Sequence, residues 1–239
     1  MPEEAPAKVT LGHLTRAERT CARRLKLEHG NARSNFGSNG RWRVSNRVTE
    51  EIRLAHTDLA VPAVGRFDAA AGDLTPEQRR VYELATRWYV TLFTRAARVV
   101  DEDQWGTDIP GDLRLVGPAG LAFTDADDQP EIRLLSFDAR PAPATALAER
   151  PGVRFALLRR VDWLRERTVR VALADLVRGT YEEDEIDTGA VMPQIKDWLA
   201  TRIGVIRARV ASAKPEAQPG LQCAWCPYIA GCPPMTGRA

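Results

Sequence analysis

The run Cys223-Ala224-Trp225-Cys226-Pro227-Tyr228-Ile229-Ala230-Gly231-Cys232-Pro233 lies close to the end of this 239-residue chain. The sequence has four cysteines, and the remaining one, Cys21, lies near the opposite end. Thiolates in a CxxCx5C spacing are typical metal ligands, and one distant cysteine completes a set of four. We therefore expect the C-terminal run to return to the N-terminal segment around one metal centre, so that both ends of the fold are stapled together.

Two other uses of these thiols stay open. Disulfides need an oxidising compartment, whereas the start Met1-Pro2-Glu3-Glu4-Ala5-Pro6 is polar and shows no apolar signal segment. Structural zinc accepts four cysteines, although such sites usually consist of two CxxC pairs. The observed spacing fits a 4Fe–4S cluster better, held by Cys21, Cys223, Cys226 and Cys232, with zinc as the alternative cofactor.

Composition indicates one soluble domain over residues 1–239, which we expect in the cytoplasm. The chain is 44% hydrophobic and has no apolar run of about 18 residues, so it can form a full core and is not expected to span a membrane. Within it we expect a mainly helical part over 12–110, a core over 111–187, a helix over 190–213 and the cysteine tail over 221–234.

The net charge of +2 hides a strong segregation of charge along the chain. Residues 1–50 carry ten Lys and Arg against five acids, while residues 101–138 carry ten acids against two bases. A basic stripe suits a phosphate backbone, although a solvated helix face has the same composition. The candidate nucleic-acid-binding residues are Arg16, Arg19, Arg23, Arg24, Lys26, Arg159 and Arg160.

Helix signals mark three stretches. Thr75-Pro76-Glu77-Gln78 is a capping box with proline at the first helical position. The apolar stripe expected to be buried after it consists of Val81, Leu84, Ala85, Trp88, Leu92, Ala96 and Val99. Further helices are expected over 154–167 and 190–212.

The period changes to that of strands after Gly111. Leu113 to Phe123 and Glu131 to Asp138 form an expected hairpin around an Asp-rich turn whose residue types need no metal. Residues 169–176 are expected to form a strand, and the acidic residues 180–187 an edge strand or loop. The mixed order predicts an α/β core.

The basic helical stretch Leu14 to Leu27 around Cys21, together with the terminal CxxCx5C, resembles the iron–sulfur branch of the RecB-like PD-(D/E)XK nucleases. That branch contains AddB and the CRISPR-associated RecB-like exonucleases. The resemblance implies a restriction-endonuclease-like mixed sheet flanked by helices, closed by a 4Fe–4S cluster on four cysteines. It also implies a nuclease centre in the middle of the chain, with a helix histidine, a GxxD strand, a DxK strand end and a QxxxY helix.

Most positions that match those motifs have lost the residue type that the reaction uses. Gly117-Pro118-Ala119-Gly120 stands where GxxD belongs, and Asp138-Ala139-Arg140 keeps only the acid of DxK. Ala156 to Arg160 falls at QxxxY, and Asn46 stands for the histidine, with His56, interpreted as a surface residue, as the other candidate. One carboxylate positions Mg²⁺ weakly, and Arg140, which stays protonated, cannot shuttle a proton.

These losses predict a catalytically degenerate, non-enzymatic protein that binds nucleic acid or acts as a scaffold. The family implies a partner such as a helicase, nuclease or other ATPase in repair, recombination or defence. One alternative is an active exonuclease that uses Mg²⁺ or Mn²⁺ with Asp138 and displaced carboxylates, for which Asp101, Glu102, Asp125, Asp127, Asp128 and Glu131 are available. Another is a redox-responsive regulator in which loss of the cluster releases the tail.

Overall fold

The computed structural model describes residues 7–16, 40–67, 74–100, 106–109, 113–137 and 145–211. They form an α/β fold with two mixed sheets flanked by helices, which confirms the expected fold class at this level. The chain divides into two compact units, each built from separate stretches of sequence. Within the described ranges, no helix is both long enough and apolar enough to cross a membrane.

The first unit comprises Met1–Gly37, Gln104–Pro118 and Pro193–Ala239. Its sheet has β4 (Leu113–Val116) in the centre, parallel to β1 (Ala7–Val9) and antiparallel to β3 (Gly106–Ile109). The short helix α1 (Leu11–Arg16) follows β1, and most of α7 (Thr188–Val210) belongs to this unit. Arg16, at the end of α1, is exposed.

The second unit, Ser38–Asp103 with Ala119–Met192, contains the five-stranded sheet. The strand order is β2-β5-β6-β7-β8, and only β6 and β7 run parallel to each other. The strands are β2 (Arg98–Val99), β5 (Leu121–Thr124), β6 (Pro130–Ser136), β7 (Thr168–Asp175) and β8 (Thr180–Asp187). The acidic strand β8 lies at the edge, as the sequence predicts.

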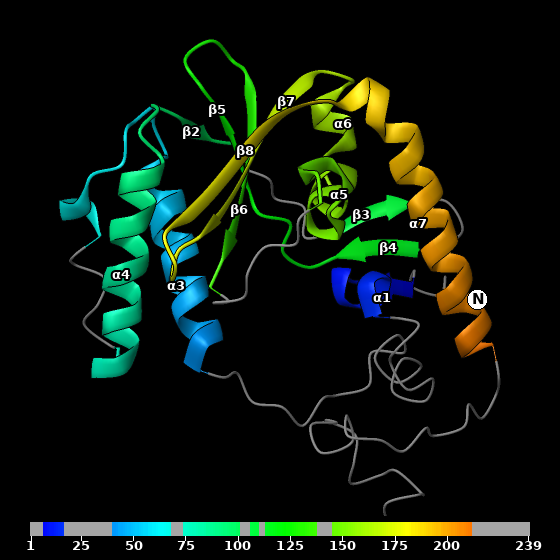
Figure 1. The fold of residues 1–239 in the computed structure, drawn as a ribbon, viewed down its shortest axis with the longest axis horizontal. Coiled ribbons are helices and arrows are strands. Elements are labelled where there is room, and N and C mark those ends of the chain that lie inside the picture. Colours follow the sequence, from blue (N-terminus) through cyan, green and yellow to red (C-terminus); the bar gives the residue numbers. More distant parts are fainter. Residues whose placement is uncertain are drawn as a thin grey trace, which may run out of the picture. The chain divides into compact units, whose positions relative to one another are not determined.

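Helices complete this unit (Figure 1). The long helices α3 (Gly40–Ala55) and α4 (Pro76–Leu92) lie side by side on one side of the sheet, and the 3₁₀ turn η1 (Val64–Arg66) lies between them in sequence. Parallel strands need a crossover connection, and here η3 (Leu147–Glu149), α5 (Pro151–Leu158) and α6 (Val161–Leu164) link β6 to β7. The crossover therefore places α5 beside β6.

The capping box at the start of α4 is confirmed. The Gln78 backbone N–H donates to the Thr75 hydroxyl at 3.3 Å, and the Thr75 N–H donates to the Gln78 side chain at 3.1 Å. The expected buried face is right only in part. Ala85 is buried, and Val81, Trp88 and Leu92 pack against the core, but the other buried residues of α4 are Tyr82, Thr86 and Tyr89, and Leu84 is 36% exposed. The helix also ends at Leu92, so the last two members of the expected stripe lie beyond it.

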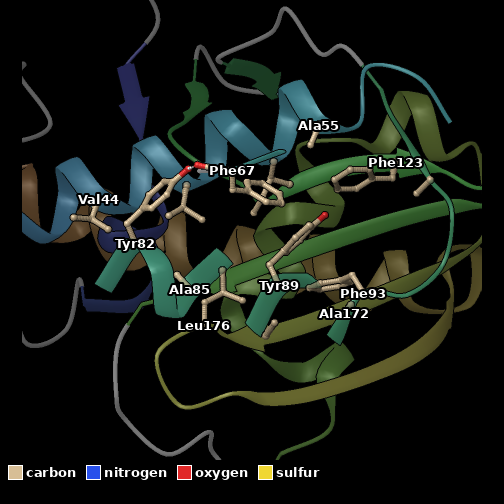
Figure 2. Close-up of a cluster of buried hydrophobic side chains, with 14 of the residues drawn as sticks. Val44, Ala55, Phe67, Tyr82, Ala85, Tyr89, Phe93, Phe123, Ala172 and Leu176 are labelled. Atoms are coloured by element: carbon tan, nitrogen blue, oxygen red, sulfur yellow. Dashed lines mark hydrogen bonds between the residues drawn. The ribbon is translucent and has the colours of Figure 1, made fainter. Parts of the chain in front are cut away.

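The core of this unit lies between α3, α4 and the sheet (Figure 2). Tyr89 is its centre: its ring lies 4.7 Å from that of Phe93 and 6.3 Å from that of Phe67. The sheet contributes Phe123, Ala172 and Ala174, whose small or flat side chains admit the tyrosines of α4.

The hairpin expected over 113–138 is confirmed around its turn and wrong at its start. β5 and β6 pair antiparallel around the Asp-rich turn, but the expected strand over 113–123 is two strands that belong to different sheets. Gly117 and Gly120 adopt positive φ angles of 106° and 76°, which end one strand before the next begins.

The later elements follow the sequence more closely. β7, β8 and α7 agree with their expected ranges within two residues. The single helix expected over 154–167 is instead two helices, α5 and α6, separated at Arg159 and Arg160. Arg160 is the N-cap residue of α6, and its backbone is not helical, with φ −125° and ψ 16°.

Candidate functional site

Charged residues stand in register across one face of the five-stranded sheet. Glu131 on β6 pairs with Arg170 on β7, which pairs in turn with Glu185 on β8. In the next row on the same face, Arg133 pairs with Ala172, and Ala172 pairs with Glu183. Side chains two residues apart share a face of a strand, so β6 and β8 together present alternating charges to one side.

Arg133 and Glu131 form a buried ion pair at the centre of this face. The Arg133 guanidinium donates from Nε to Glu131 Oε1 at 2.7 Å and from a terminal nitrogen to Oε2 at 3.2 Å. Their side chains are only 1% and 3% exposed. The guanidinium also lies 4.1 Å from the ring centroid of Phe123 and 4.5 Å from that of Phe93. Removing two charges from water is costly, so the stability of the fold depends on both partners of such a pair being present.

A hydrogen-bonded chain extends from this pair to His56. Arg133 donates to the Tyr89 hydroxyl oxygen, and the Tyr89 hydroxyl lies 3.0 Å from His56 Nε2. His56 Nδ1 lies 2.8 Å from the Ala97 carbonyl oxygen, which can only accept. We therefore assign the proton of a neutral imidazole to Nδ1, and Tyr89 then donates to Nε2.

Burial sets the protonation of both groups. Desolvation lowers the pKa of His56, and the positive charge of Arg133 lowers it further, while the Ala97 carbonyl acts in the opposite direction. Burial likewise raises the pKa of Tyr89 to about 12. Both side chains are therefore neutral at pH 7, and each of Arg133, Tyr89 and His56 has a hydrogen-bond partner.

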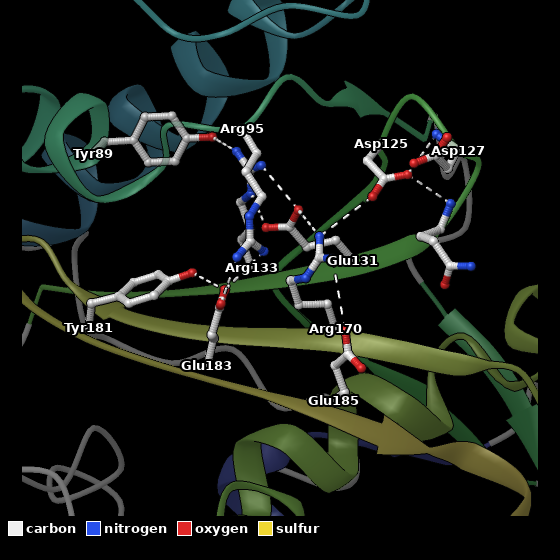
Figure 3. A network of polar contacts seen from close by, with 11 residues as sticks. Tyr89, Arg95, Asp125, Asp127, Glu131, Arg133, Arg170, Tyr181, Glu183 and Glu185 are labelled. Atoms are coloured by element: carbon white, nitrogen blue, oxygen red, sulfur yellow. Dashed lines mark hydrogen bonds and ion pairs between the residues drawn. The ribbon is translucent and has the colours of Figure 1, made fainter.

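A second, more exposed group lies beside the buried pair (Figure 3). Arg95 donates to Glu183 Oε1 at 2.9 Å and to Oε2 at 3.4 Å, and the Tyr181 hydroxyl donates to the same carboxylate. Burial opposes ionisation of Glu183, but the hydrogen bonds from Tyr181 and Arg95 outweigh it and lower the pKa of the carboxyl. Burial first, and then Glu183, raise the pKa of Tyr181. Glu183 is therefore a carboxylate.

These side chains line a pocket of about 100 Å³. Phe93 and Tyr181 supply aromatic surface, with their ring centroids 5.4 Å apart and nearly perpendicular. Arg95 and Arg133 supply cations, and Glu131 and Glu183 supply anions. The pocket thus combines an aromatic wall with balanced charges.

Arg170 connects the buried pair with the Asp-rich turn. Its terminal nitrogens lie 3.6 Å from Asp125, 3.9 Å from Glu131 and 3.9 Å from Glu185. The other oxygen of Asp125 accepts from the backbone N–H groups of Asp127 and Gln129. This is the ordinary turn chemistry that the sequence predicts. Among the residues that the structure describes, no group of three or more His, Cys, Asp or Glu could hold a metal ion.

Gly120 occupies the position that the resemblance assigns to a metal-binding aspartate. A Cβ atom there would lie 2.6 Å from the Arg133 carbonyl oxygen, in addition to the strain of the positive φ. The Arg160 guanidinium donates to the Ala119 carbonyl at 2.6 Å and to the Gly120 carbonyl at 2.9 Å. A side chain from the expected QxxxY position therefore binds the backbone of the expected GxxD position.

Other predicted residues are placed as follows. Asn46 is exposed on α3, as a polar substitute on a helix surface would be. The interpretation of His56 as a surface residue is wrong: it is fully buried, since it joins the Tyr89 and Ala97 contacts. Asp138, Arg140 and the displaced carboxylates Asp101 and Glu102 lie outside the described residues. So do all four cysteines.

Two of the predicted phosphate-binding side chains other than Arg16 fall within the described ranges. Arg159 is partly buried, while Arg160 is buried and its terminal nitrogens donate to backbone carbonyls. We remove Arg160 from the nucleic-acid-binding set, because a guanidinium in this position has little surface to offer a phosphate. Arg19, Arg23, Arg24 and Lys26 lie outside the described residues.

The sequence did not reveal the buried network, although Glu131 was named as a displaced carboxylate and His56 as a candidate for the family's histidine. The available signal was the alternation Glu131-Ile132-Arg133, which places two opposite charges on one face of an otherwise apolar strand. No protein-family model matches the sequence, and the comparison with curated proteins gives no match either.

Proposed function

We propose that this chain is a catalytically inactive nucleic-acid-binding or scaffolding subunit that acts beside a helicase, nuclease or other ATPase. The proposal keeps the resemblance of the sequence to RecB-like iron–sulfur nucleases and takes the loss of the metal centre as its main feature. Its cofactor is a 4Fe–4S cluster on Cys21, Cys223, Cys226 and Cys232. Its contribution to a complex is binding and support rather than cleavage.

The observation that carries the proposal is the contact of Arg160 with the carbonyls of Ala119 and Gly120. Nuclease chemistry at this point would need a carboxylate oxygen to hold Mg²⁺ or Mn²⁺. Instead the backbone is closed against a side chain at Gly120, and a permanent cation lies on it. A divalent metal ion at the same place would meet like charge in a poorly hydrated environment.

The neighbouring carboxylates do not restore the missing ligand. Glu131 is bound through both oxygens to Arg133, and Asp125 is occupied by its own turn and by Arg170. Freeing Glu131 for a metal would leave the buried Arg133 without its counter-ion, which costs several kcal/mol, on the order of 3–5. The same residues that could have rescued catalysis thus stabilise the sheet.

A nuclease assay tests the catalytic part of this proposal. The wild-type protein should show no multiple-turnover cleavage of single-stranded or duplex DNA, or of RNA, with Mg²⁺ or Mn²⁺. The matched control is Asp138→Ala, which removes the one acid kept from the expected motif. Cleavage by the wild type that disappears in Asp138→Ala would instead establish an active nuclease.

A binding assay tests the other part. The expected binding is weak, independent of sequence and steeply dependent on salt, because phosphate contacts release counter-ions. Charge reversal of Arg23 and Arg24 should weaken it, whereas charge reversal of Arg207 on α7, which lies outside the proposed basic segment, should not. If binding is absent at about 50 mM salt, or unchanged by the reversal, the chain has a purely protein-binding role.

A further inference from the structure

The pocket beside the buried ion pair has unused hydrogen-bonding groups. An arginine has five N–H donors, and Arg133 uses three of them, two for Glu131 and one for Tyr89. Among the described residues, one N–H on each terminal nitrogen of Arg133 therefore has no hydrogen-bond partner. Arg95 uses two of its five donors for Glu183. Donors thus remain on both cations that line the pocket.

Acceptor sites also remain. A carboxylate offers about four lone-pair positions. Glu183 uses three of them, for two bonds from Arg95 and one from Tyr181, and Glu131 uses two for Arg133. The pocket can therefore donate and accept on the same ligand.

The balance of charge narrows the class of that ligand. Two guanidinium groups face two carboxylates, so an anion or a cation would each meet repulsion from half of the lining. A neutral ligand meets none. The partly exposed ring of Tyr181 adds a surface that suits a planar molecule, and about 100 Å³ is room for a single ring system and not for a drug-sized ligand.

A nucleobase is a neutral planar molecule with donors and acceptors along one edge. Proteins that bind single strands stack unpaired bases on aromatic side chains and read the exposed edges by hydrogen bonds. Guanine matches the pocket better than the other bases, because its O6 accepts from arginine while its adjacent N1–H and N2–H₂ groups donate to a carboxylate. Adenine would turn its N1 lone pair toward a carboxylate.

We propose that this pocket binds one unstacked guanine base of a single-stranded nucleic acid. Glu183 accepts from the base edge, Arg95 donates to its oxygen, and Tyr181 contacts its ring, while the buried Glu131–Arg133 pair completes the lining of the pocket (Figure 3). The inference rests on the proposed nucleic-acid-binding function and gives it a base preference. Arg95 and Glu183 are 53% and 31% exposed, so a base can reach them from solvent.

The test compares guanosine 5′-monophosphate with adenosine 5′-monophosphate by isothermal titration calorimetry on the full chain. The phosphate is common to both, so the difference reports the base. The expected preference for the guanine nucleotide is about tenfold or more. Glu183→Gln should reduce the preference to about twofold or less, since the variant keeps the side-chain size and removes the charge.

Asp184→Asn is the matched control. It removes the same charge from the neighbouring residue of β8, which points to the opposite face of the strand, so the preference should be unchanged. Circular dichroism of all three proteins shows that they share one fold. Equal affinity of the wild type for both nucleotides, no binding of either one, or an undiminished preference in Glu183→Gln would each overturn the inference.

A second measurement separates this inference from the function on which it rests. Fluorescence anisotropy compares an oligothymidylate with the same strand carrying one central guanine. Equal, salt-dependent binding of both strands would reject the guanine pocket and leave the proposed function in place. Binding of the mononucleotide that depends on Glu183, with no binding of either strand, would retain the pocket and reject the proposed function.

Discussion

Replacing Arg133 by methionine should destabilise the second unit strongly. Methionine keeps most of the aliphatic volume but removes the cation that Glu131 contacts at 2.7 and 3.2 Å. Glu131 is 3% exposed, so it would be left as a buried carboxylate whose remaining ion-pair partner among the described residues is Arg170, 3.9 Å away. Breaking one partner of such a pair costs about 3–5 kcal/mol in the free energy of unfolding.

Two smaller effects also lower the free energy of unfolding of Arg133→Met. The variant loses the contacts of the guanidinium with the rings of Phe93 and Phe123, each worth about 0.5–2 kcal/mol when desolvated. It also removes the donor to Tyr89, while the bond from Tyr89 to His56 remains. These losses overlap with the ion-pair loss and are not additive, so we keep the estimate of about 3–5 kcal/mol.

The double variant Glu131→Leu with Arg133→Met separates lost charge from lost packing. Removing both charges removes the desolvation cost of both, so its stability should return to within about 1–2 kcal/mol of the wild type. Arg95→Met is the matched control, because the Arg95–Glu183 pair is much more exposed. An exposed pair contributes about 0–1 kcal/mol.

Urea unfolding under anaerobic conditions, followed by circular dichroism, measures these differences. Midpoints give changes in stability as long as the slopes of the transitions agree. The reasoning is refuted if Arg133→Met lies within about 1 kcal/mol of the wild type, or if the double variant is less stable than the single one.

Three further outcomes are expected. The pKa of His56 in the folded protein lies below 6.5, so just below pH 6.5 His56 takes up a proton in the unfolded chain and not in the folded one. The free energy of unfolding should therefore fall on acidification by up to about 1.4 kcal/mol per pH unit. His56→Asn should remove this part of the pH dependence. Gly120→Ala should cost about 1–3 kcal/mol or more in chemical unfolding, whereas Gly152→Ala, with open space around its Cβ, should be neutral or stabilising. Anaerobically purified protein should contain about four irons and absorb broadly near 400 nm, and Cys21→Ser should lose iron as fully as Cys226→Ser, while stoichiometric zinc without iron would contradict the cluster.

Local sequence signals predicted those parts of the fold that local physics determines. The Thr75 hydroxyl and the Gln78 side chain lie within one helical turn, so the start of α4 depends on neighbours in sequence. The same is true of the Asp125 turn, where one side-chain oxygen accepts two nearby backbone N–H groups. Such features need no knowledge of distant residues.

The buried face of α4 could be predicted only in part in this way, since Ala85 is buried as expected and Tyr82 and Tyr89 were missed. An apolar pattern favours Leu84 over Tyr82 and Tyr89, because a tyrosine hydroxyl is costly to bury without a partner. The fold supplies those partners: Tyr82 donates to the Phe67 carbonyl, and Tyr89 contacts both His56 and Arg133. With these partners in place, the face of α4 that carries the tyrosines can be buried.

The sequence by itself determined which chemistry this chain can carry. It gives the number and spacing of the cysteines, the segregation of charge, and the presence of Gly120 and Arg140 where the resemblance expects an aspartate and a lysine. Only the tertiary structure decided which side chains meet. His56 contacts a carbonyl 41 residues away, and Arg133 contacts a hydroxyl 44 residues away. Buried charges are tolerated only where a partner completes them, and the packing of α4 and of the turn after α3 against the sheet brings these partners together.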